Sequence, residues 1–371
     1  MIRKCLAVGI ILLFTGAGII PATAQNGEKP SLPTSNGHWL YVGGSGPGNY
    51  SRIQDAIDNA SDGDIVFVFD DSSPYKGVVL VSKSVTIQGE NKNTTIIDSG
   101  GFIISVSNVT ITGFTIQNSE AGVYIIGYKQ PTCHNIVDNN IFLNVSIGVN
   151  VYSDNWPYDN FNATKYGYNV ISNNLIIYTK TVGIIIAYGH DNIVIGNDVS
   201  QDDKYHDRNN LGRGIWAAGD FNNISYNNNI SYNNVHDNVI GIEIEWLNRT
   251  EVYRNIIKGN YMWGLFVVNP SLDRVLQNNF ISNWMDVRIW MLGVSLSSIL
   301  GFTFDGNYWG RARLLPRPIG GLFINKLYTT LLIWYGLFGE KGLTLLVNYY
   351  SNFVRFDWHP AQEPYDITGM T

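Results

Sequence analysis

Residues able to act on a sugar lie close together in the middle of this sequence of 371 residues. Glu243, Glu245 and Trp246 share one short apolar segment, and Trp216 and Asp220 belong to the segment before it. The polar stretch that precedes both segments adds Asp202, Asp203, His206 and Asp207. Aromatic rings stack on sugar faces, and two carboxylates at a suitable separation can act as general acid and base on a glycosidic bond. These residue types therefore indicate a carbohydrate site.

A repeated short segment must position these side chains. Segments that open with Gly and alternate in polarity start at residues 122, 148, 183, 214, 241 and 264, and one opening with Asp starts at 286. Their starts are 22 to 35 residues apart, as expected for a coil of about 22 residues with loop insertions. Each coil alone cannot bury its apolar side, so the coils must stack. The repeat predicts an all-β, single-stranded, right-handed parallel β-helix over residues 39–309.

Alternation along each segment sorts its side chains into inward and outward columns. The first and third residues after Gly are expected to point inward, and the second and fourth outward. The outward columns are Tyr124, Asn150, Ile185, Trp216, Glu243, Phe266, Arg288 and Ile126, Tyr152, Ala187, Ala218, Glu245, Val268, Trp290. The long insertions 153–168 and 201–213 leave on the same side, where binding loops of repeat proteins gather.

The predicted carbohydrate-binding residues follow from these columns and loops. They are Tyr124, Tyr152, Trp216, Glu243, Glu245, Trp246 and His206. Candidate catalytic carboxylates are Glu243, Glu245, Asp202, Asp203 and Asp220. The alternative is that Glu243 and Glu245 are only the solvated side of a strand and that loops cover Trp216.

A second column of polar residues precedes the strands. It consists of Asn140, Asn174, Asp198, Asn234, Asn255, Asn279 and Asn307. Equivalent turn residues of stacked coils lie about 4.8 Å apart, so their amides can bond to one another. The column predicts an asparagine ladder.

Both ends of a solenoid need caps because open strand edges aggregate. Ser51 and Gln54 read as a capping box that starts a helix over 51–60, whose apolar face would cover the first coil. Residues 310–371 differ in composition and are expected to form an irregular C-terminal cap. Leu327–Phe338 is apolar but short and interrupted, so membrane contact by this segment is not expected.

The N-terminus indicates export. Arg3 and Lys4 precede the apolar run Leu6–Ile20, and small residues at 22–24 suit a signal peptidase, which predicts a signal peptide at 1–24 and a linker at 25–38. We expect a secreted, extracellular, periplasmic or cell-surface protein, with nine Asn-X-Ser/Thr sequons available for glycosylation. The net charge is −6 and becomes −8 without Arg3 and Lys4, which argues against a nucleic-acid partner. Cys133 alone remains after cleavage, so no intrachain disulfide is expected.

These features resemble a known family. Tyr41–Gly44, the helix at 51–60, the segment Gly63–Val68 and the Gly-led strands closing on Asn307–Trp309 are similar to pectin-lyase-like β-helix proteins, and specifically to the NosD-like or carbohydrate-binding and sugar-hydrolase repeat group. The resemblance covers residues 39–309. It implies the fold and an exported protein, but the fold hosts lyases, hydrolases, adhesins and accessory proteins alike.

The resemblance leaves three functions open. The first is a polysaccharide-binding or structural surface protein, whose partner is a polysaccharide or surface glycan. The second is a glycoside hydrolase or polysaccharide lyase, although only Asp202-Asp203 and Gly189-His190-Asp191 echo the hydrolase motifs. The third is a NosD-like copper-site accessory role. No cofactor is predicted, because neither a carboxylate cluster for calcium nor a Cys, Met and His cluster for copper is evident.

Overall fold

The computed structural model describes residues 37–127, 132–153, 167–201, 212–219, 225–292, 301–311, 317–324 and 350–367. The compact unit to which they belong begins at Gly37. Asp202, Asp203, His206, Asp207 and Asp220 of the predicted site lie outside the described residues, as do the predicted signal peptide and the apolar segment 327–338. Within the described part, no helix is long and apolar enough to cross a membrane.

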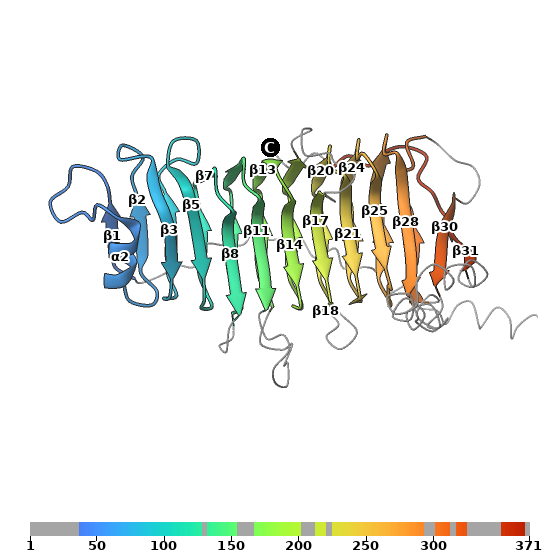
Figure 1. The fold of residues 1–371 in the computed structure, drawn as a ribbon, viewed down its shortest axis with the longest axis horizontal. Coiled ribbons are helices and arrows are strands. Elements are labelled where there is room, and N and C mark those ends of the chain that lie inside the picture. The colour runs from blue at the N-terminus through green and yellow to red at the C-terminus, as the bar shows by residue number, and fades with distance from the viewer. Residues whose placement is uncertain are drawn as a thin grey trace, which may run out of the picture. The chain divides into compact units, whose positions relative to one another are not determined.

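The chain winds through successive coils whose strands stack in parallel on three faces (Figure 1). Face A consists of β1 (Trp39–Val42), β2 (Ile65–Val68), β4 (Thr86–Gly89), β6 (Thr110–Thr112), β9 (Ile136–Asp138), β12 (Val170–Ser172), β15 (Ile193–Ile195), β19 (Asn229–Ser231), β23 (Glu251–Tyr253), β26 (Arg274–Leu276) and β29 (Thr303–Asp305). A two-stranded addition, β18 (Ser225–Tyr226) with β22 (Leu247–Asn248), joins two neighbouring coils.

The other two faces begin with β3 (Tyr75–Val81) and β5 (Ile96–Ile104), which pair in parallel. Face B continues as β7 (Thr115–Gln117), β10 (Ile141–Leu143), β13 (Leu175–Thr179), β16 (Asp198–Gln201), β20 (Asn234–His236), β24 (Ile256–Lys258) and β27 (Asn279–Ile281). Face C continues as β8 (Ala121–Gly127), β11 (Ile147–Ser153), β14 (Val182–Ala187), β17 (Arg213–Ala218), β21 (Ile240–Glu245), β25 (Trp263–Val268), β28 (Met285–Leu292) and β30 (Arg317–Ile324). The strand β31 (Tyr350–Asp357) closes this face by pairing antiparallel with β30. The predicted parallel β-helix is therefore confirmed.

The alternation predicted for the Gly-led strands is also confirmed. The first and third residues after Gly, such as Ile184 and Ile186 of β14, belong to the main core, whereas Ile185 between them belongs to a separate apolar cluster. Gly recurs at the strand starts because the coils approach closely there: a Cβ atom on Gly183 would lie 2.6 Å from the carbonyl oxygen of Gly214 on the next coil. That distance is shorter than van der Waals contact, so only Gly fits.

The asparagine ladder exists, but the sequence placed three of its seven members one residue too late. The ladder runs through Asn140, Asn174, Asn197, Asn233, Asn255, Asn278 and Asn307, each bonded to the next. Asp198, Asn234 and Asn279 instead begin face B strands. At each of these three positions, two residues that could join the ladder, Asn or Asp, follow one another. The backbone directs only the side chain of the first residue into the ladder. Each amide accepts from the backbone N–H of the previous coil, for example Asn233 N to Asn255 Oδ1 at 3.0 Å.

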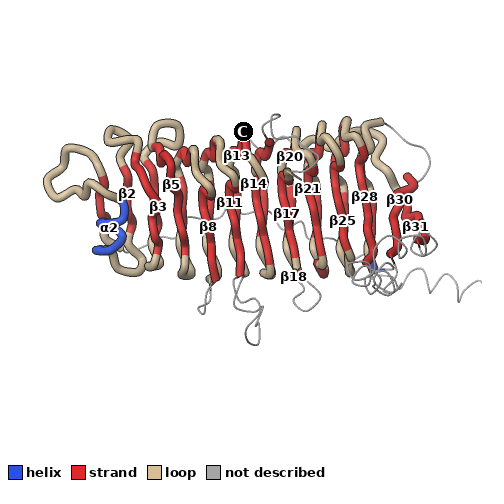
Figure 2. Tube along the Cα trace, in the orientation of Figure 1, coloured by secondary structure: helices blue, strands red, loops and turns tan. Residues whose placement is uncertain are grey.

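A helix covers the N-terminal coil, as predicted, but it starts differently. Helix α2 (Ile53–Asn59, blue in Figure 2) has Arg52 as its N-cap, without a side-chain cap hydrogen bond. The predicted capping box is therefore wrong, because the Gln54 side chain bonds to Leu80 of strand β3 and to Asp58 instead. Ile53, Ala56 and Ile57 are buried, so the apolar face packs where the sequence predicted.

At the other end, the carboxylate of Asp357 closes the ladder. It accepts from Asn307 N at 2.9 Å and from Trp309 Nε1 at 3.0 Å. Asp357 itself is fully buried at the end of β31. This contact ties the C-terminal strand to the last coil.

Candidate functional site

The outer side of face C contains a cleft of about 280 Å³. Its described lining comes from five stacked coils and consists of Tyr124, Asn150, Tyr152, Ile185, Ala187, Tyr188, Trp216, Ala218, Gly219 and Glu245. The strands position these residues by parallel pairing. Asn150 of β11 pairs with Tyr124 of β8, and Ile185 of β14 pairs with Trp216 of β17.

The structure brings four of the predicted binding residues together around this cleft: Tyr124, Tyr152, Trp216 and Glu245. The pairings reproduce both outward columns deduced from the sequence, from Tyr124 to Arg288 and from Ile126 to Trp290. Their binding role remains a prediction. Tyr188 was missed because it follows the fourth strand position, where a left-handed turn at φ 59° redirects the chain. The sequence did contain a signal for Tyr188, namely an aromatic residue directly after the last outward position of its strand.

Two contacts hold the indole of Trp216 in place. Its Nε1 donates to Glu245 Oε2 at 3.2 Å, and the Arg213 guanidinium carbon lies 4.7 Å from the ring centroid. The first contact fixes the plane of the ring, and the second covers it with a cation, an attractive arrangement for an aromatic face. Trp216 is only partly buried and lines the cleft. The side chain is therefore a preformed stacking surface.

Glu243 was expected to present a second carboxylate on the outer side of the strand, but the structure shows that it does not. It lies in the outward column, yet it is 1% exposed and forms an ion pair with Arg213 Nε. Burial raises the pKa of Glu243 to about 8, against the lowering influence of the Arg213 guanidinium and with a further upward contribution from the Glu245 carboxylate. Glu243 does not line the cleft, so of the two glutamates only Glu245 is available to a ligand there.

Trp246 also lies apart from the cleft. It follows β21 in a left-handed turn, with φ 53°, and is absent from the described lining. By contrast, Asn150, a member of the outward column, lines the cleft, and its buried Oδ1 has no hydrogen-bond partner among the described residues. A buried acceptor without a partner costs free energy that a donor on a ligand would recover.

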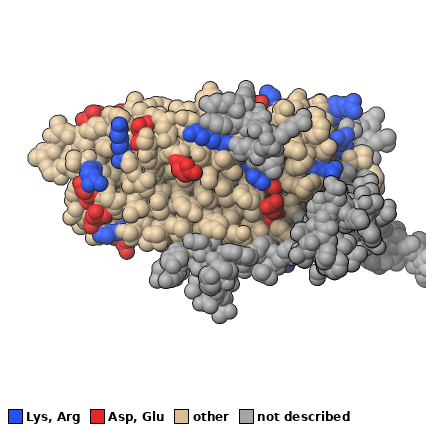
Figure 3. Space-filling model, in the orientation of Figure 1, with Lys and Arg blue, Asp and Glu red and all other residues tan. Residues whose placement is uncertain are grey.

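An apolar cluster on the outer side of face C forms the base of the cleft. Val182, Ile185 and Ala187 are buried there, and Tyr152, Tyr188 and Trp216 pack against them. Tyr152 and Tyr188 meet edge to face, with ring centroids 5.8 Å apart. The face drawn in Figure 3 shows few charged side chains among its described residues. The cleft therefore combines apolar packing with a few polar groups, as small-ligand sites do.

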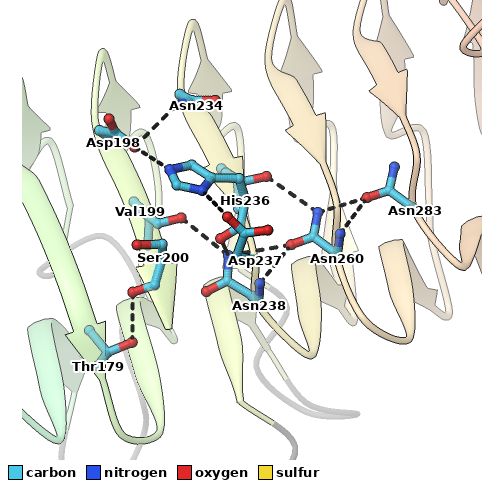
Figure 4. Close-up of polar contacts among 11 residues, drawn as sticks. Thr179, Asp198, Val199, Ser200, Asn234, His236, Asp237, Asn238, Asn260 and Asn283 are labelled. Atoms are coloured by element: carbon cyan, nitrogen blue, oxygen red, sulfur yellow. Dashed lines mark hydrogen bonds and ion pairs between the residues drawn. The ribbon is translucent and has the colours of Figure 1, made fainter. Parts of the chain in front are cut away.

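A separate polar cluster surrounds His236 on face B (Figure 4). Its Nε2 lies 2.9 Å from Asp198 Oδ1 on the preceding coil, and its Nδ1 lies 2.7 Å from Asp237 Oδ2. The hydrogen bond to Asp198 and the contact with Asp237 raise the pKa of His236, against partial desolvation. Both ring nitrogens are thus engaged, and the contact of Nε2 links two neighbouring coils. Among the described residues, no three His, Cys, Asp or Glu side chains are grouped to hold a metal ion.

A search of curated proteins gave no match. Among solved structures, XylC in complex with xylose is 10% identical over 77% of this chain and 71% of its own, with a TM-score of 0.48. The A-module of the Azotobacter vinelandii mannuronan C-5 epimerase AlgE4 is 12% identical over 70% of this chain and 74% of its own, with a TM-score of 0.49. The pectate lyase Pel9A is 15% identical over 74% and 81%, with a TM-score of 0.44.

The family described as "Right handed beta helix region" matches residues 99–284, half of the sequence, and this stretch contains all the described strands that line the cleft. The chain belongs to the right-handed β-helix family.

Proposed function

We propose that this chain is an exported glycan-binding β-helix whose cleft on face C holds part of a polysaccharide. The observation that carries the proposal is the composition of the cleft: Trp216, Tyr124, Tyr152 and Tyr188 line it together with one amide and one carboxylate. Aromatic side chains supply large apolar contact and retain a polar atom for hydrogen bonding. Sugar rings present both an apolar face and hydroxyl groups, so they match such a surface.

Binding is better supported than hydrolysis by the same geometry. Two carboxylates that act on one glycosidic bond must both reach it from opposite sides. Glu245 reaches the cleft, but the Glu243 carboxylate is buried against Arg213. The volume of about 280 Å³ is close to the lower end of ligand cavities, which begin near ~300 Å³. The cleft therefore suits a short stretch of a longer glycan.

Replacing Trp216 with Ala is expected to weaken glycan binding about 10-fold or more, because truncating a central aromatic anchor removes most of its contact energy. Ligands from a glycan array would be titrated calorimetrically against wild type and variant. Trp284→Ala is the matched control, since Trp284 is 72% exposed, precedes β28 and does not line the cleft. Absence of binding by the wild type, or equal affinities in Trp216→Ala and wild type, would remove the proposal.

Export is the second part of the proposal, and the N-terminal sequence supports it. The run Leu6–Ile20 follows Arg3 and Lys4 and ends at small residues, as in secretory signals. We expect the protein recovered from outside the cytoplasm of its host to begin near Gln25. Intact-mass analysis and N-terminal sequencing would measure this, and a full-length chain retained in the cytoplasm would contradict it.

A further inference from the structure

Glu245 is the single formally charged side chain in the described lining of the cleft, and its charge is negative. Tyrosines, a tryptophan, an asparagine and small or aliphatic residues make up the rest. Low-dielectric apolar walls strengthen the field of a charge inside a cleft. A carboxylate brought into this cleft would therefore be repelled by Glu245, and no described lining residue offers a compensating cation.

The nearest described cation is already engaged. The Arg213 guanidinium pairs with the buried Glu243 and lies over the ring of Trp216. Arg213 does not line the cleft, and its side chain is 20% exposed. Recruiting it to a ligand carboxylate would break both contacts and leave the buried Glu243 side chain without this hydrogen-bond partner. The guanidinium is thus held in place by contacts within the protein.

The polar side chains of the lining include acceptor oxygens beside the tyrosine hydroxyls, which can both donate and accept. Asn150 Oδ1 is buried without a hydrogen-bond partner among the described residues, and Glu245 Oε2 accepts a hydrogen bond from Trp216 Nε1. A carboxylate oxygen can take several donors, so Glu245 retains capacity. These acceptors require hydroxyl or ammonium donors from a ligand. The net charge of −6 on the chain adds a longer-range repulsion of polyanions.

We propose that the cleft selects sugars that offer hydrogen-bond donors and carry no carboxylate, and that it rejects uronic acids. This proposal rests on the proposed glycan-binding function and narrows its ligand class. Neutral hexoses and amino sugars share the required chemistry. An amino sugar would gain further from its ammonium group beside Glu245.

The test compares three oligosaccharides of equal length, namely cellohexaose, chitosan hexamer and hexagalacturonate, by calorimetric titration at low ionic strength. The uronate is expected to bind at least about 10-fold more weakly than the better of the other two. Raising the salt concentration should narrow this ratio, because salt screens the repulsion at the open cleft. The two remaining ligands separate neutral from amino sugars as the preferred class.

Glu245→Gln supplies the decisive variant. It removes the charge and keeps an oxygen that can accept from Trp216 Nε1. The ratio of uronate to neutral-sugar dissociation constants should fall about 10-fold in Glu245→Gln. Glu251→Gln is the matched control, because Glu251 lies on β23 of face A, away from the cleft, and should leave the ratio unchanged. If Glu245→Gln fails to fold, the salt dependence of the wild-type ratio decides the matter.

Failure of this proposal differs from failure of the proposed function. Tight hexagalacturonate binding that is lost in Trp216→Ala would overturn the selectivity while retaining the glycan site, as would an unchanged ratio in Glu245→Gln. If none of the three sugars binds the wild type, and none does on the array, both proposals fail.

Discussion

Replacing Asp357 with Ala is expected to lower the free energy of unfolding by about 4 kcal/mol, because it leaves several buried donors without an acceptor, each costing about 1–3 kcal/mol. These donors are the backbone N–H groups of Gly306 and Asn307 and the side-chain N–H groups of Asn307 and Trp309, at 2.9 to 3.1 Å from the carboxylate. Denaturant unfolding followed by circular dichroism would measure the change.

The expected loss has a further physical reason. Asp357 ends a continuous chain of hydrogen bonds, since Asn307 in turn accepts from Asn278 N at 2.9 Å. Neighbouring coils of a solenoid stabilise one another, so weakening the terminal contact should destabilise the coils next to it. Asp305→Ala is the matched control. Its carboxylate is 54% exposed and contacts His359, and exposed pairs contribute at most about 1 kcal/mol. Equal stability of the two variants would contradict this role for Asp357.

Replacing Asp273 with Asn is expected to stabilise the protein at pH 8 and to destabilise it at pH 4. Asp273 is fully buried, and this desolvation raises its pKa to about 7, against the lowering influence of the N–H groups of Thr250 and Ser271. A carboxyl whose folded pKa exceeds its unfolded value of 3.8 imposes no penalty below pH 3.8. Its contribution to stability is lost as the pH rises towards 7.

The magnitude follows from the pKa of Asp273, which is about 7 in the folded protein and 3.8 in the unfolded chain, because a pKa difference of one corresponds to about 1.36 kcal/mol. The stability of Asp273→Asn relative to wild type should therefore improve by about 4 kcal/mol at most between pH 4 and pH 8. At pH 4 the variant is the weaker protein, because an amide cannot accept from both Thr250 N and Ser271 N, which lie 2.7 and 2.8 Å from the two carboxylate oxygens.

Urea unfolding at the two pH values would measure this reversal. Asparagine is expected to fit at position 273, because preceding coils carry asparagine at the equivalent positions. These residues are Asn135, Asn169, Asn192 and Asn228. Asp58→Asn serves as a control, because Asp58 is exposed on helix α2 and its carboxyl is not desolvated by burial. A difference between Asp273→Asn and wild type that does not change with pH would show that Asp273 is not held in its neutral form.

Local alternation made the strands of face C predictable. Within each Gly-led segment, inward and outward side chains alternate with a period of two residues. The outward column from Tyr124 to Arg288 could therefore be predicted without knowing the structure of any loop. The ladder was harder to predict, because a shift of one residue changes which side chain belongs to it. Where Asn233 and Asn234 follow one another, residue type cannot tell which of them the turn directs inward.

Only the site residues that belong to the outward columns were predictable from the sequence. The sequence assigned Trp216 and Glu245 to the outward columns, and parallel strand pairing brings both beside the cleft. The burial of Glu243 was not predictable, since it depends on the reach of the Arg213 side chain from the neighbouring coil. The helix start at Arg52 was missed for a similar reason, because Gln54 bonds to a strand that is distant in sequence.

A crystal structure of the protein with a bound neutral hexasaccharide tests the central claim most directly. We expect a sugar ring over the indole of Trp216, with hydroxyl groups donating to Glu245 and to Asn150 Oδ1. A ligand bound on another face, or a cleft left empty while the sugar is bound elsewhere, would contradict the account.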